Sequence, residues 1–108
     1  MTITRITMFK CPDEHIKQFL EDYKELSATS TKDGKPYILS LAVGPAKPDA
    51  RSQGWTLVSK SEFASLGDMK YYDEDCEAHK SLKEKAKAFG LPGAPLTVYY
   101  EPEVSAKI

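Results

Sequence analysis

The sequence predicts a single α+β domain over residues 1–108, with the element order β-α-β-β-α-β of a ferredoxin-like fold. Three observations support this prediction. A length of 108 residues suits one domain with a modest hydrophobic core. Four short stretches are rich in β-branched and aromatic residues, which is typical of strands. Helical stretches with regularly spaced apolar residues separate these strands in the order that two β-α-β halves require.

The first half of the chain is expected to contain a strand over 3–10, a helix, and a second strand over 37–43. Pro12 suits the first turn of that helix, and the acidic residues after it favour a helix N-terminus. Its apolar stripe consists of Ile16, Phe19, Leu20, Tyr23 and Leu26. A polar stretch with the turn signal Asp33-Gly34 ends the helix, and Gly44-Pro45 is expected to end the second strand.

The second half begins with a loop over 46–54 and a third strand over 55–63. A short helix is expected to begin at Ser65, and a further helical stretch begins near Asp75. Gly90 stands where a C-terminal cap is expected. The apolar face of the later helix consists of His79, Leu82, Ala86 and Phe89. The last strand is expected over 96–100.

A fold of this kind places its helices on one face of a four-stranded antiparallel sheet and leaves the other face bare. Large apolar residues occupy alternate positions of the first and last strands: Ile6, Met8, Leu96, Val98 and Tyr100. An apolar patch of this size needs a cover, and a second copy of the same sheet supplies one. We therefore expect a homodimer joined through the sheet faces.

Composition narrows the classes of partner. The net charge of −1 gives no electrostatic reason to expect binding to nucleic acid or an acidic membrane. The sequence has no apolar run long enough to span a bilayer and no secretory signal, so we expect a cytoplasmic protein. Two cysteines, Cys11 and Cys76, and two histidines, His15 and His79, lack zinc-ligand spacing. We expect no metal, no cofactor and no disulfide.

Five short motifs in order resemble the stress-responsive dimeric α/β barrel family, known as Dabb proteins. They are Arg5–Lys10, Gly54–Val58, Met69–Tyr72, Glu77–Leu82 and Val98–Pro102. The resemblance extends over nearly the whole chain. It implies a ferredoxin-like fold in which two chains join their sheets into one barrel.

The resemblance also implies a site. One plant member of the family, olivetolic acid cyclase, closes a linear polyketide by an intramolecular aldol step, in a pocket between sheet and helices. It uses a helix histidine and a nearby tyrosine, which His79 and Tyr72 match here. The cyclase has further histidines where this chain has Arg5 and Leu57. Its pocket is apolar where this chain has Thr7 and Ser59, so the resemblance implies a different substrate.

General chemistry assigns roles to these residues. A half-shielded His79 stays neutral near pH 7 and can act as a base, and the Tyr72 hydroxyl can donate to a developing oxyanion. Tyr71 competes with Tyr72 for that role. Arg5 is expected to bind a substrate oxygen or to form an ion pair with Glu62, Glu101 or the other subunit. The expected substrate-binding residues are Arg5, Thr7, Phe9, Phe19, Tyr23, Leu57, Ser59 and Leu82.

Three functions remain open. The first is a small-molecule enzyme or binding protein, with cofactor-free proton transfer on a polyketide-like carbonyl compound as the reaction of a cyclase or lyase. The second is a non-catalytic, stress-responsive protein whose function is carried by the assembled oligomer itself. The third is a cofactor-free oxygenase. A catalytic protein needs His79 and a tyrosine hydroxyl at one cavity, whereas a structural protein fills that space with side chains.

Overall fold

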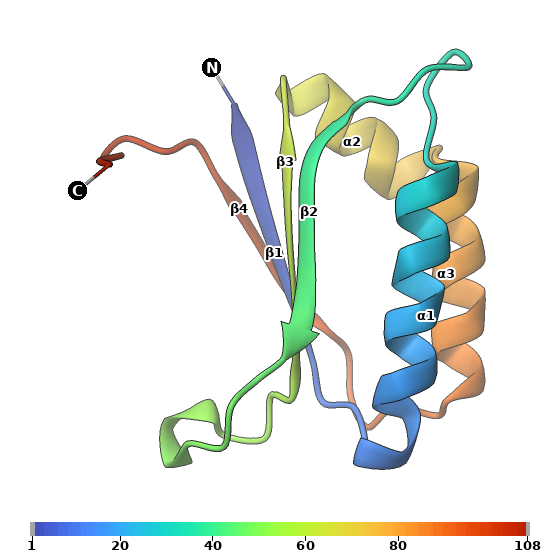
Figure 1. The fold of residues 1–108 in the computed structure, drawn as a ribbon, viewed down its shortest axis with the longest axis vertical. Coiled ribbons are helices and arrows are strands. Elements are labelled where there is room, and N and C mark those ends of the chain that lie inside the picture. Colours follow the sequence, from blue (N-terminus) through green and yellow to red (C-terminus); the bar gives the residue numbers. More distant parts are fainter. Residues whose placement is uncertain (1, 108) are drawn as a thin grey trace.

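The computed structural model describes residues 2–107 and has the predicted element order, with a short 3₁₀ turn added. Figure 1 shows the helices on one side of a single twisted sheet. The elements are β1 (Ile3–Phe9), α1 (Asp13–Thr29), β2 (Ile38–Pro45), η1 (Ala50–Ser52), β3 (Leu57–Phe63), α2 (Leu66–Glu74), α3 (Glu77–Ala88) and β4 (Leu96–Tyr100). Within the described residues, no helix is both long and apolar enough to cross a membrane.

The sheet has the strand order β2-β3-β1-β4, and each neighbouring pair is antiparallel. This is the ferredoxin-like arrangement that the sequence predicts. In the central strand β1, Arg5 lies opposite Ser61 of β3 on one side and Tyr99 of β4 on the other. Because side chains alternate along a strand, this register decides which residues of β1 can reach the helices.

The core lies between the sheet and the helices. The odd positions of β1, from Ile3 to Phe9, are buried, as are Leu57 and Phe63 of β3. From α1, Phe19 packs its ring 4.7 Å from that of Phe9 and 5.5 Å from that of Tyr23, between centroids. The apolar stripe predicted for α1 thus meets the buried face of the sheet.

Several element boundaries differ from the prediction. Helix α1 continues through the first polar residues to Thr29. Strand β2 continues through Gly44-Pro45, because β2 is an edge strand and Pro45 needs no donor on its open side. Strand β3 begins at Leu57 instead of Trp55, since the Trp55 N–H donates to the Ser52 carbonyl and closes the turn around η1.

The predicted turn and cap residues act as expected. Asp33 and Gly34 both have positive φ angles, 54° and 77°, in the tight turn between α1 and β2. The Ser65 hydroxyl accepts the Asp68 N–H and caps α2. Gly90 has φ 64° directly after Phe89, the C-cap residue of α3, and this conformation disfavours residues with a Cβ.

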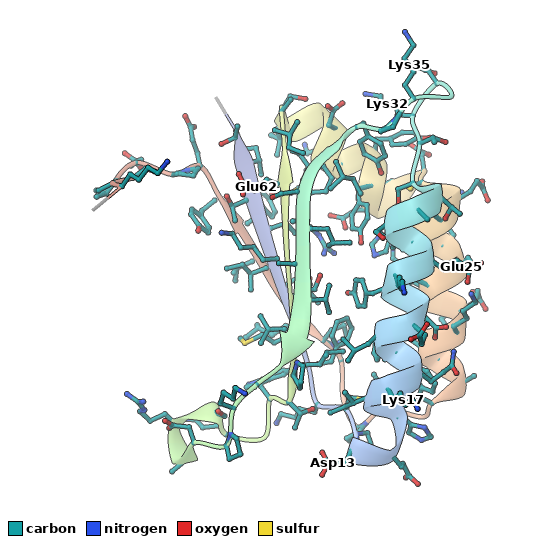
Figure 2. All side chains as sticks on the ribbon, viewed as in Figure 1. Asp13, Lys17, Glu25, Lys32, Lys35 and Glu62 are labelled. Atoms are coloured by element: carbon teal, nitrogen blue, oxygen red, sulfur yellow. The ribbon has the colours of Figure 1, made fainter. Side chains whose placement is uncertain are left out.

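The far face of the sheet has no helix over it (Figure 1), and its apolar part lies on β1 and β4. In Figure 2, Glu62 of β3 points to this side, away from the helices. The even positions of β1 pair with β4 across this face, Ile6 with Val98 and Met8 with Leu96. Val98 is 50% exposed and Leu96 43%. The bare apolar face expected from the sequence is therefore present in the chain.

Candidate functional site

A break between α2 and α3 sets the position of His79. In a continuous α-helix the Cys76 N–H would donate to the Tyr72 carbonyl. Here the N–H groups of Asp75 and Cys76 both donate to the Tyr71 carbonyl, at 2.8 and 2.9 Å. The Tyr72 carbonyl is left without its helical partner, and the Nδ1 of His79 lies 2.8 Å from it.

This hydrogen bond determines the chemistry of the imidazole. A carbonyl oxygen only accepts, so Nδ1 must carry the proton, and in the neutral ring Nε2 then has a free lone pair. The His79 ring also stacks on the Tyr72 ring, with centroids 3.8 Å apart. These two contacts hold the ring in one orientation and one tautomer.

Burial keeps His79 neutral. The residue is 5% exposed, and this burial, with help from the charges of Lys83 and Arg5, lowers its pKa to about 4. The Tyr72 carbonyl and Asp73 act in the opposite direction, but with smaller effect. At any pH well above this value the imidazole is unprotonated and its Nε2 lone pair is free, but the lowered pKa makes it a weaker base than an exposed histidine.

A cavity of about 160 Å³ lies beside His79, between the sheet and helices α1 and α3. Its polar walls come from β1, β4, α1 and α3, and its other walls are aromatic and aliphatic. The lining residues are Arg5, Thr7, Phe9, Phe19, Tyr23, His79, Leu82, Lys83, Ala86, Pro95 and Thr97. We call this space the cavity.

Most of the predicted substrate-binding residues line the cavity: Arg5, Thr7, Phe9, Phe19, Tyr23 and Leu82. Leu57 and Ser59 are buried in the sheet's inner face and do not line it. The lining residues Lys83, Pro95 and Thr97 were not predicted from the sequence. Thr97 could have been predicted, because antiparallel pairing of the last strand with β1 can place it opposite Thr7.

Among the described residues, the tyrosine that lines the cavity is Tyr23 of α1. Burial raises its pKa, whereas Ser59 and the charge of Arg5 act in the opposite direction. Tyr72 is only 2% exposed and lies outside the lining, and burial raises its pKa strongly. Tyr72 thus contacts His79 through its ring and carbonyl, while Tyr23 is the tyrosine that lines the cavity. Tyr71 donates its hydroxyl to the Thr31 carbonyl instead.

Within the chain, Arg5 pairs with neither of the expected partners Glu62 and Glu101. Its Nη2 lies 2.8 Å from Oδ1 of Asp73 in α2. Glu62 cannot reach it, because alternation places position 62 on the opposite face from position 5. Nη1 of Arg5 donates to the Thr7 hydroxyl at 2.8 Å, and that hydroxyl is 2.9 Å from the hydroxyl of Thr97.

The chain belongs to the stress-responsive A/B barrel domain (Dabb) family, whose model matches residues 3–90. A protein of the fusaristatin A biosynthesis cluster of Gibberella zeae is 40% identical over 104 residues, which are 95% of this chain and 75% of that protein.

Solved structures share the fold. A dimeric protein of ferredoxin-like fold from Bacteroides fragilis has a TM-score of 0.69 at 21% identity, over 93% of this chain and 95% of its own. The hydroxynitrile lyase of Passiflora edulis has a TM-score of 0.71 at 17% identity, over 97% of both chains. At these identities the likeness supports the fold alone.

Proposed function

We propose that the protein is a cofactor-free enzyme, a cyclase or lyase, that moves a proton on a carbonyl compound bound in the cavity. The observation that carries this proposal is His79, buried and neutral, with its Nδ1 proton donated to the Tyr72 carbonyl. A neutral side chain with a lone pair left at Nε2 and a cavity beside it supplies the unprotonated nitrogen that a general base requires.

The proposed proton transfer needs only the substrate, His79 and Tyr23. Nε2 of His79 removes a proton from the carbon next to the carbonyl, and the C–H electron pair forms the enolate. The Tyr23 hydroxyl donates a hydrogen bond to the enolate oxygen, which lowers the energy of the developing charge. The imidazolium then returns the proton to the product or to a leaving group. In a cyclase, the enolate carbon attacks a second carbonyl of the same molecule before the proton returns.

Two relatives are consistent with small-molecule chemistry. The 40% identical protein of Gibberella zeae is named for a biosynthesis cluster, and the structurally similar Passiflora edulis protein is named as a lyase. The Gibberella zeae relative supports small-molecule chemistry without naming a substrate, and the Passiflora edulis structure adds only that this fold can carry a lyase.

Proton transfer can be tested without knowing the natural substrate. The probes are 3-oxooctanoate and its methyl ester in D₂O, with deuterium uptake at the carbon between the carbonyls followed by NMR. The protein should accelerate uptake above the buffer rate. His79→Ala should lose about a hundredfold or more of this acceleration, as general bases do elsewhere.

The matched control is the other histidine. His15 stacks on Phe89 outside the cavity, so His15→Ala should keep the full rate. Circular dichroism of each variant checks that it is folded. A folded His79→Ala protein that exchanges as fast as the unmodified one would exclude His79 as the base, and the non-catalytic oligomer would then be the better account.

We further propose that the protein works as a homodimer joined through the far faces of two sheets. This proposal is supported by three apolar residues of β4 that are 43 to 50% exposed in the single chain: Leu96, Val98 and Tyr100. The Bacteroides fragilis protein of similar fold is described as dimeric.

A further inference from the structure

An apolar groove adjoins the cavity. It has a volume of about 420 Å³ and shares four lining residues with the cavity: Phe9, Lys83, Ala86 and Pro95. Its other walls are the end of α3 and the segment before β4, with Lys87, Gly90, Leu91 and Gly93. Small-molecule sites usually occupy about 300–1,000 Å³. The cavity alone is smaller than this, so a molecule of ordinary ligand size would extend from the cavity into the groove.

The charged residues around these two spaces are basic. Arg5 and Lys83 line the cavity, and Lys83 and Lys87 line the groove. Neither lining contains Asp or Glu among the described residues. Asp73 pairs with Arg5, but its side chain is 32% exposed and it lies outside both linings. With His79 neutral, the complementary ligand carries a negative charge.

Arg5 is the basic group best placed to bind that charge. Its side chain is 9% exposed, and its Nε is buried without a hydrogen-bond partner among residues 2–107. The guanidinium has five N–H donors, of which Thr7 and Asp73 engage one each. Unused donors in a buried cation are costly, and a carboxylate is the group that matches their planar arrangement.

We propose that Arg5 sets substrate specificity by binding the carboxylate of an amphipathic molecule whose apolar chain lies in the groove. The proposal rests on the proposed function for the place of the site and adds the class of substrate. The carboxylate binds in the cavity beside Arg5 and the Thr7–Thr97 pair. The chain packs along Phe9, Ala86 and Pro95, where the lysine stems add apolar surface.

The test measures binding and needs no turnover. Isothermal titration would compare hexanoate, octanoate and decanoate with the alcohols of equal length. Each carboxylate should bind at least about tenfold more tightly than its alcohol, because the charged hydrogen bonds are absent from the alcohol. Affinity should rise about fourfold with each added methylene until the groove is filled.

Variants test where each end of the ligand binds, the carboxylate at Arg5 and the apolar chain in the groove. Arg5→Met should remove the preference for the carboxylate. Asp73→Asn should strengthen octanoate binding severalfold, because it removes the anion that competes for Arg5 and keeps the cation. Ala86→Leu at the junction should weaken decanoate more than hexanoate. Lys80→Gln, exposed on the same helix and outside both linings, should change nothing.

The outcomes are separable. Equal binding of octanoate and octanol, or Asp73→Asn without effect in a folded protein, would overturn the proposal. So would a loss of octanoate binding in Lys83→Gln and Lys87→Gln with Arg5→Met unaffected, because the anion would then lie at the groove. Arg5-dependent carboxylate binding without His79-dependent exchange would keep this inference and reject the enzyme.

Discussion

At the scale of single residues, His79 couples proton binding to folding. In the unfolded chain a histidine has a pKa near 6.5, whereas in the folded protein burial lowers the pKa of His79 to about 4. Between these values the unfolded state binds more protons, so stability rises with pH. The contribution should be fully present above about pH 6.5 and lost as pH falls towards 4, amounting to about 3 kcal/mol.

Urea unfolding at pH 4.5, 5.5 and 7, at one protein concentration, measures this effect. Carboxylates also titrate in this range, so the informative quantity is the difference between the unmodified protein and His79→Gln. The variant should show a flatter dependence of its unfolding free energy on pH. Parallel curves for the two proteins would mean that the pKa of His79 in the folded state is not lowered.

A second prediction at this scale concerns the two tyrosines near His79. If Tyr23 is the oxyanion donor, Tyr23→Phe should cost about a hundredfold or more in the exchange rate. Tyr72→Phe should cost little, because it keeps both the stacked ring and the carbonyl that accepts from Nδ1. The reverse pattern would instead assign the role to the Tyr72 hydroxyl, as the sequence analysis expects. Melting temperatures of both variants separate loss of activity from loss of fold.

At the scale of elements, the sequence could not specify the hydrogen bonding at the break between α2 and α3. The acidic run Asp73–Asp75 indicates an interruption, and two helices are found there. Whether Cys76 donates to the Tyr71 or the Tyr72 carbonyl depends on a single step in the backbone. Sequence patterns do not resolve element ends to one residue, yet this step decides which groups of Tyr72 face His79.

Strand alternation was more informative. It groups Arg5, Thr7 and Phe9 on one face of β1 from the sequence alone, and all three line the cavity. Leu57 and Ser59 share the inner face of β3 and stay in the core, because distance from the cavity depends on strand order and helix placement. Lys83 could not be found in this way, since an exposed lysine on a helix is usually solvated. Lys83 lines both the cavity and the groove, and the groove is formed in part by the loop after α3.

At the scale of the whole molecule, the far face of the sheet sets the expected oligomeric state. The helices lie on one face only, so apolar residues of β1 and β4 remain uncovered in the isolated chain (Figure 1). Val98→Lys would place a charge on this face at the centre of β4, at a position that is 50% exposed in the single chain. In the proposed face-to-face dimer this position would be buried. Burying an unpaired charge costs several kcal/mol, so the variant should dissociate or aggregate.

Sedimentation equilibrium at micromolar concentration tests this prediction. The unmodified protein should sediment at twice the mass of the chain, and Val98→Lys and Met8→Glu should sediment as monomers or aggregate. Ser81→Lys adds the same charge on the exposed side of α3 and should remain dimeric. Because the cavity lies on the opposite face of the sheet, a monomeric variant that stays folded should still bind octanoate. A stable monomer of the unmodified protein would show that the apolar face of β1 and β4 does not join two copies.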